Sequence, residues 1–165
     1  MRTPAGSIVR LLLISGPLVL VASASGTVAS SAAAAQPTCL NTEYLTDPLG
    51  LDVRRPRLSW KIKSNRRGER QSAYQVLVAS SPDLLESNQG DLWDSGKVSS
   101  GNSISVVYEG SPLKTSQRCY WKVRIWDRAN RPSDWSKPAQ WTMGLLRAGD
   151  WQAEWIGYDA ERVEE

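Results

Sequence analysis

The chain has 165 residues and a formal net charge of +3, and it contains eight tryptophans but no phenylalanine and no histidine. Without histidine, catalytic triads of the serine or cysteine type and most metal sites are excluded, and two isolated cysteines give no metal-ligand spacing. The glycines fall in separate turns and form no phosphate-binding loop, so we predict no cofactor.

The first part of the chain has the pattern of a secretory signal peptide. Two arginines precede an apolar run over residues 11–21, and small residues follow it, with cleavage expected near Ser25 or Gln36. The alternative is an N-terminal membrane anchor, but Pro17 interrupts the run, which is shorter than the roughly 20 apolar residues of a membrane span. Cys39 lies too far downstream for a lipid anchor. We therefore predict a secreted protein, either extracellular or periplasmic.

Residues 1–35 are assigned to this signal peptide and a low-complexity leader. Their removal takes away Arg2 and Arg10 and no acidic residue, so the formal net charge falls from +3 to +1. The electrostatic argument for binding nucleic acid or an anionic membrane is then lost. We expect neither as a partner.

The remaining chain reads as short strands separated by turn residues. Alternation of apolar and polar residues predicts seven strands, over residues 40–45, 57–63, 72–80, 92–95, 103–108, 118–127 and 137–143. One helical turn is predicted over 81–86, where a serine cap and a proline open it. Seven strands with this spacing predict an all-β domain over residues 39–144, an immunoglobulin-like or fibronectin-like sandwich of two sheets rather than a barrel.

The periodicity also assigns side chains to faces. Trp60, Trp121 and Trp141 share faces with aliphatic residues, so we predict that they lie in the core. Leu77 lies on the opposite face of its strand, which indicates that this second face is partly covered.

The two cysteines are predicted to stay unpaired. If Leu40 and Tyr44 point into the core, Cys39 points outward, whereas Cys119 has the parity of Trp121 and points inward. An exported protein permits a disulfide, but this parity opposes one.

Trp126 and Trp135 allow two interpretations. Trp126 shares a face with Lys122 and Arg124, and the hairpin that follows would return Trp135 over the same face. A structural ladder of tryptophan and cation is one interpretation, worth about 0.5–1 kcal/mol for each exposed pair. The other is a platform on which the apolar face of a sugar stacks.

A glycosidase needs two acids at a set separation, and two local pairs of carboxylates are candidates for such a pair. They are Asp91 with Asp94 and Asp127 with Asp134. Each lies at a strand end or in a turn, where carboxylates commonly accept hydrogen bonds from backbone amides. We therefore predict no catalytic residue in this chain.

Residues 145–165 follow the predicted sandwich. We interpret residues 145–150 as a linker and residues 151–157 as the first strand of a second sandwich, for which the sequence offers no partner strand. This pattern predicts a truncated polypeptide.

Several runs are more specific than a generic sandwich. Leu113, Cys119, the run WKVR at 121–124 and Trp135 resemble the sixth and seventh strands of a fibronectin type III domain. That family usually has tyrosine where this chain has Cys119, so the resemblance leaves its tyrosine corner in doubt.

Six runs, in the same order, resemble the N-terminal region of bacterial α-L-rhamnosidases of glycoside hydrolase family 78. They are DPLGLD (47–52), PRLSW (56–60), QSAYQVLVASS (71–81), GDLWDSGKV (90–98), WTMGLL (141–146) and DWQAEWIG (150–157). The resemblance implies a multidomain enzyme that removes terminal α-L-rhamnose with inversion, using carboxylates of a helical barrel to which no position here corresponds. It also implies that Leu77 and Leu145-Leu146 pack against the downstream domains.

The favoured interpretation is thus a non-catalytic domain of a secreted rhamnosidase, with the downstream domains of the same polypeptide as partners. A stand-alone carbohydrate-binding or adhesion module, with rhamnose-containing glycans as ligands, is the alternative. A third possibility is that the chain is itself a hydrolase, which release of nitrophenol from a rhamnoside would reveal.

Overall fold

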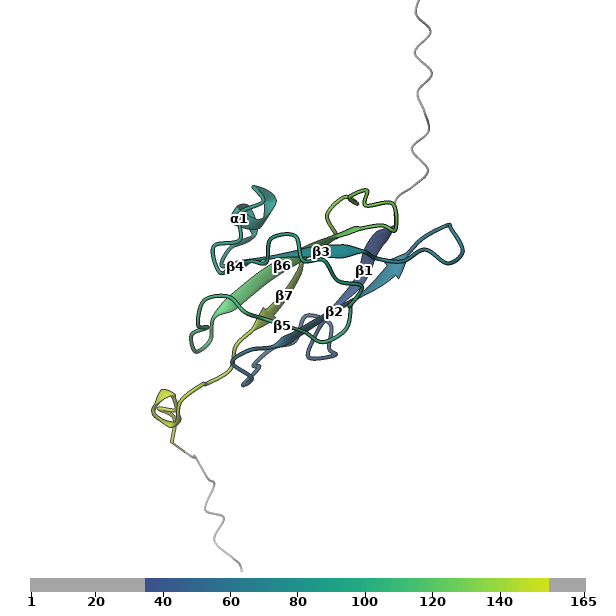
Figure 1. Ribbon diagram of the computed structural model, residues 1–165. Helices are drawn as coiled ribbons and strands as arrows, with labels where there is room; N and C mark the ends of the chain where they lie inside the picture. The colour runs from purple at the N-terminus through teal and green to yellow at the C-terminus, as the bar shows by residue number, and fades with distance from the viewer. Residues whose placement is uncertain (1–34, 155–165) are drawn as a thin grey trace, which may run out of the picture. The chain divides into compact units, whose positions relative to one another are not determined.

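The computed structural model describes residues 35–154. These residues form two antiparallel sheets that face each other across one hydrophobic core (Figure 1). The all-β, two-sheet sandwich predicted from the sequence is therefore confirmed. The predicted signal peptide and the second half of the predicted strand at 151–157 lie outside the described residues, and residues 151–154 form no strand.

One sheet has three strands and the other has four. The three-stranded sheet has the order β1 (Gln36–Thr42), β2 (Arg57–Lys63) and β5 (Val106–Val107). The four-stranded sheet has the order β4 (Trp93–Asp94), β3 (Ala73–Ala79), β6 (Arg118–Trp126) and β7 (Ala139–Thr142). One helical turn, α1 (Pro82–Glu86), follows β3, and a 3-10 turn, η1 (Ala148–Asp150), follows β7. No helix in the described part of the chain is long and apolar enough to cross a membrane.

The predicted core tryptophans all lie between the sheets. Trp60, Trp121 and Trp141 are buried. The Trp60 ring meets Tyr74 edge to face with centroids 5.2 Å apart, a preferred aromatic geometry. Its Nε1 donates to Gln71 Oε1 at 2.9 Å, so the indole nitrogen is satisfied inside the core.

The first strand differs from its prediction at both ends. β1 ends at Thr42, because Glu43 and Tyr44 adopt left-handed backbone conformations with φ of 49° and 66° in a tight turn. The backbones of Thr42 and Leu45 close this turn with hydrogen bonds in both directions. Tyr44 is therefore 58% exposed instead of pointing into the core, and Arg57 lies over its ring at 4.9 Å.

The fifth strand is shorter than predicted. Ser105 has a φ of 56°, and its backbone N–H donates to the Ser59 hydroxyl at 3.0 Å rather than to a strand carbonyl. Only Val106 and Val107 then pair with β2.

The second face of β3 is covered by this chain itself. The helical turn α1 packs on β3 and β6, and Leu85 forms a small second core with Leu77 and Ala79. Leu77 is fully buried there. The expectation that Leu77 packs against a downstream domain is therefore wrong, because α1 already occupies that face. Of the predicted linker, Leu146 packs partly on the main core and Leu145 is exposed.

The cysteines are free, as predicted. Cys39 is exposed and Cys119 is fully buried. A shift of the β1–β2 register between Thr38 and Asn41 marks a bulge at Cys39, whose φ is 50°. The bulge directs Cys39 to solvent while Leu40 remains in the core.

Candidate functional site

The tryptophans predicted as a ladder or a sugar platform lie on the outer face of the four-stranded sheet. Trp126 ends β6, and Trp135 belongs to the segment 133–136, which runs beside β6. Backbone N–H groups of Ser133 and Ser136 donate to the carbonyls of Ile125 and Val123, each at 2.8 Å.

The hydroxyl groups of the same two serines complete the pairing. Ser133 Oγ accepts from the Ile125 N–H and Ser136 Oγ accepts from the Val123 N–H, each at 3.1 Å. The side chains thus replace backbone carbonyls as acceptors, and the intervening Trp135 is held over the side chains of β6.

Three cationic side chains alternate with the two indole rings. Lys97 Nζ lies 4.7 Å from the Trp126 centroid, and the Arg124 guanidinium lies 5.0 Å from Trp126 and 4.7 Å from Trp135. Lys122 Nζ lies 5.1 Å from Trp135. The predicted structural ladder is present, with Lys97 as a member that the strand pattern did not reveal because it comes from a separate loop.

Lys122 also connects the ladder to α1. Its buried ammonium donates to Leu85 O at 2.5 Å and to Asn88 Oδ1 at 2.7 Å. Burial lowers the pKa of Lys122, and the nearby Glu86 carboxylate opposes that change.

The two indole rings differ in how much of their surface a ligand could reach. Trp126 is only 8% exposed beneath its cations. Trp135 is partly exposed and lines a groove of about 590 Å³ between β1 and the start of β7, together with Thr38, Asn41 and Lys137. Sugar stacking by Trp126 and Trp135 stays a prediction, and only Trp135 borders this groove.

Three of the four candidate carboxylates accept hydrogen bonds that shape turns. Asp91 accepts from the backbone N–H and hydroxyl of Ser80, at 2.8 and 2.6 Å. Asp94 Oδ1 accepts from the Gly96 N–H at 2.8 Å and from Gln75 Nε2 at 2.7 Å. Among the described residues, no group of three or more His, Cys, Asp or Glu side chains could hold a metal ion.

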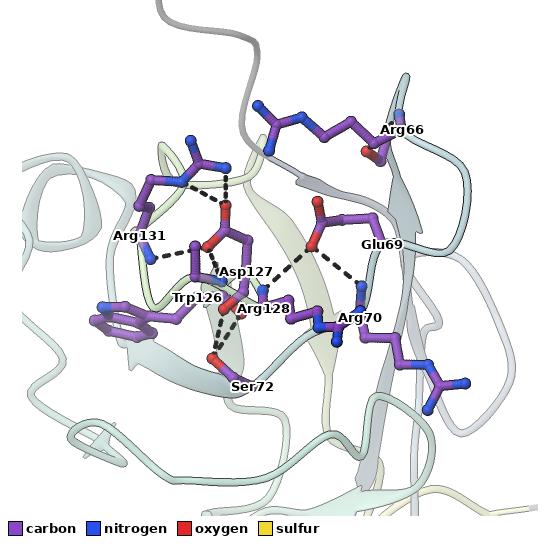
Figure 2. A network of polar contacts seen from close by, with 10 residues as sticks. Arg66, Glu69, Arg70, Ser72, Trp126, Asp127, Arg128 and Arg131 are labelled. Carbon is purple, nitrogen blue, oxygen red and sulfur yellow. Dashed lines mark hydrogen bonds and ion pairs between the residues drawn. The ribbon is translucent and has the colours of Figure 1, made fainter.

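Asp127 organises the loop that follows β6 (Figure 2). Its Oδ1 accepts from the N–H groups of Ala129 and Arg131 at 2.8 and 2.9 Å, and the Arg131 guanidinium pairs with Oδ2 at 2.6 Å. Burial by itself would raise the pKa of Asp127, but the hydrogen bonds from Arg131 and Ala129 prevail and hold it below its ordinary value.

Sequence patterns did not indicate that this loop meets the loop after β2. Glu69 Oε1 accepts from the N–H of Arg128 and from that of Arg70, each at 3.2 Å, so one carboxylate joins the two loops (Figure 2). The available signal was the clustering of arginines in both loops.

Comparisons with known proteins place this sandwich in a family. A family model described as a Rha78A-like, N-terminal immunoglobulin domain matches residues 37–147. The α-L-rhamnosidase of Streptomyces avermitilis is 49% identical over 127 residues, which cover 77% of this chain and 12% of that protein. An α-L-rhamnosidase of Formosa agariphila is 46% identical over 112 residues, which cover 67% of this chain and 12% of that protein. The chain thus spans only 12% of the length of these curated relatives.

Comparison with solved structures gives the same result as the sequence comparisons. The crystal structure of the Streptomyces avermitilis α-L-rhamnosidase complexed with L-rhamnose matches with a TM-score of 0.71 and 50% identity, over 75% of this chain and 12% of that one. The structure of the α-L-rhamnosidase from Dictyoglumus thermophilum matches with a TM-score of 0.71 and 39% identity, over 74% of this chain and 14% of that one. The resemblance stated from sequence motifs is confirmed, and the chain belongs to the Rha78A-like, N-terminal immunoglobulin domain family.

Proposed function

We propose that this chain is a non-catalytic N-terminal domain of a secreted α-L-rhamnosidase of glycoside hydrolase family 78. The parent enzyme would hydrolyse terminal non-reducing α-L-rhamnose from glycosides or polysaccharides. The domain's role is positional: it supports the domains that follow it in the polypeptide. Similarity to rhamnosidases of which the matched region makes up only 12% supports the assignment.

The observation that carries the positional role is an apolar surface where the chain leaves the sandwich. Leu49 is 79% exposed, and Val53 and Leu145 are also exposed. We call these three residues the exit surface. The three residues lie on two segments, 47–54 and 142–146, that backbone hydrogen bonds join, and exposed apolar groups on adjoining segments can form an interaction site.

The loop that carries Leu49 and Val53 is held firmly to residues 142–146, at the end of β7 and just after it. Thr142 donates to Pro48 O at 3.0 Å, Leu51 donates to Thr142 O at 2.9 Å, and Gly144 donates to Leu51 O at 2.7 Å. Arg54 Nη2 donates to Leu146 O at 2.8 Å. A loop that is already ordered loses little conformational entropy when a partner covers it.

A chimeric enzyme tests this role. Residues 37–147 would replace the matching region of the Streptomyces avermitilis α-L-rhamnosidase, and we expect the chimera to hydrolyse p-nitrophenyl α-L-rhamnoside.

Leu49→Ser with Val53→Ser should lower the thermal midpoint of the chimera, because two polar side chains then enter an apolar interface. Ile104→Ser, at another exposed site, is the matched control. Equal losses for the control and the double variant would refute docking through the exit surface.

The same assay on the chain alone tests the non-catalytic assignment. We expect no release of nitrophenol from the rhamnoside. Turnover that copurifies with the chain would overturn the proposal.

The groove beside Trp135 favours a second candidate, a carbohydrate-binding module for neutral rhamnosides. Retention of the chain on immobilised L-rhamnose that Trp135→Ala abolishes, with the fold intact, would support it. No retention would leave the positional role as the function of the domain.

A further inference from the structure

Two loops at one end of the sandwich bring an unusual number of arginines together. The loop between β2 and β3 carries Arg66, Arg67 and Arg70, and the loop after β6 carries Arg128 and Arg131. We call these five residues the arginine cluster. The acids in the two loops, taken as residues 64–70 and 127–134, are Glu69, Asp127 and Asp134, and among the described residues no ion pair joins Asp134 to an arginine of the cluster.

The acids do not neutralise most of this cluster. Asp127 is buried and pairs with Arg131. The Glu69 carboxylate accepts its hydrogen bonds from backbone N–H groups of both loops. Within residues 35–154, no ion pair engages the guanidinium groups of Arg66, Arg67, Arg70 or Arg128, and these four residues are exposed.

The loops surround a depression that a ligand group can enter. It has a volume of about 390 Å³ and is lined by Arg66, Arg67, Glu69, Arg128 and Arg131. In Figure 2 the side chains of Arg66 and Arg131 lie on either side of the space above the Asp127 and Glu69 carboxylates.

The loop after β6 is held in place before any ligand arrives. Besides the bonds to Asp127 and Glu69, Ser72 Oγ donates to Asp127 O at 2.7 Å and Ser72 N donates to Trp126 O at 2.8 Å. The backbone that carries Arg128 and Arg131 is therefore fixed against the start of β3. An ordered frame reduces the entropy lost on binding.

Arginine rather than lysine indicates the class of ligand. A guanidinium presents two parallel N–H donors that match the paired oxygens of a carboxylate or a phosphate, whereas lysine acts as a point charge. We propose that the arginine cluster binds the carboxylates of an acidic polysaccharide, that is, a chain of uronate sugars. The choice of a polysaccharide over other polyanions rests on the proposed function, in which the parent enzyme acts on glycosides or polysaccharides.

Affinity electrophoresis of the purified chain tests the site, with polygalacturonate in the gel as the probe. We expect retardation that fully methyl-esterified polygalacturonate does not cause, because esterification removes the charge and leaves the sugar backbone. High salt should abolish the retardation, because exposed charges are screened. Retardation by the ester to the same extent would overturn the proposal.

Charge-removing variants locate the binding. Arg66→Gln with Arg128→Gln should weaken binding to polygalacturonate about fivefold, with an unchanged thermal midpoint, since each exposed ion pair contributes only a small part of the binding energy. Lys114→Gln with Arg118→Gln removes the same charge from exposed positions at the other end of β6 and should have little effect. Equal weakening by the two double variants would mean that net charge alone attracts the polymer, and it would refute binding at the arginine cluster.

Two further probes test whether the arginine cluster prefers carboxylates to other anionic groups. Dextran sulfate and duplex DNA carry sulfate and phosphate instead of carboxylate, and we expect weaker retardation by each at equal charge concentration. Retardation as strong as that by polygalacturonate, or stronger, would refute selection of uronates. This assay needs no hydrolysis, so an inactive chimera would count against the proposed function and leave the uronate site standing.

Discussion

Cys119 and Asp127 are both buried, yet their surroundings move their pKa values in opposite directions. Burial raises the pKa of the Cys119 thiol to about 12, and the charge of Asp91 adds to the rise. Burial would also raise the pKa of Asp127, but donors from Arg131 and Ala129 reach its carboxylate and lower it. The difference is the presence of hydrogen-bond donors that stabilise the charged form.

Thiol labelling provides the first prediction. At pH 8 the folded chain should react with a chromogenic disulfide reagent at Cys39 only, because Cys119 is buried and remains a thiol. Both cysteines should react in denaturant. A Cys39→Ser variant that still reacts rapidly when folded would contradict the buried position of Cys119.

Asp127 provides the second prediction. Asp127→Asn should lower the free energy of unfolding at pH 7 by about 2 kcal/mol, because a buried charged acceptor is lost. The folded-state pKa of Asp127 lies below its ordinary value of 3.8. The stabilisation is therefore fully present above that value and disappears as the pH falls through the folded-state pKa.

Denaturant unfolding of the wild type and the Asp127→Asn variant at neutral and acid pH measures this difference. Asp134→Asn, at an exposed position of the same loop region, is the control and should have little effect. A gap between wild type and Asp127→Asn that widens in acid would contradict the sign of the pKa change.

At the scale of elements, the helical turn α1 has the most unexpected role. It is only five residues long, and Ser81 caps it by accepting a hydrogen bond from the Leu84 N–H. Helices this short have little stability of their own. Packing of Leu85 on Leu77 and the bonds from Lys122 hold α1 on the outer face of the sheet.

The third prediction follows from that packing. Leu85→Ala should lower the free energy of unfolding by about 2–4 kcal/mol, because it leaves a cavity over Leu77. Leu49→Ala removes the same atoms from a side chain that is 79% exposed and should have little effect on the isolated chain. Thermal or denaturant unfolding measures both, and similar losses for the two variants would refute the role assigned to α1.

At the scale of the whole molecule, the loop at 47–54 and the segment leaving β7 act as one unit. A Cβ atom on Gly144 would lie 2.8 Å from the carbonyl oxygen of Gly50, which is backbone and cannot rotate away. Gly50 itself has a φ of +72°, a conformation that favours glycine. Close backbone contact therefore fixes the position of the exit surface.

The fourth prediction tests this contact. Gly144→Ala should destabilise the chain by about 1–3 kcal/mol through overpacking and should lower the thermal midpoint of the rhamnosidase chimera further, because the exit surface moves. Gly101→Ala, whose Cβ would come no closer than 3.4 Å to its one neighbour, the Gln71 carbonyl oxygen, lies within residues 37–147 and is the control. Calorimetry of the isolated chain and the chimera compares them, and equal shifts for both variants would refute the role of the contact.

The sequence alone determined the two-sheet all-β fold, the three core tryptophans, the shared outer face of Trp126 and Trp135, and the family motifs. These follow from alternation and short-range pattern, which the two-residue period of a strand imposes directly. Tertiary structure alone decided the outward turn of Tyr44, the short β5 and the cover of α1 over Leu77.

Tertiary structure also decided that the arginine-bearing loops meet through Glu69 and that Lys97 joins the ladder. Left-handed turns, side chains that replace backbone acceptors and contacts between distant loops depend on how the sheets pack. Such packing brings together residues that are far apart in the chain, and the local periodicity of the sequence does not reveal these contacts.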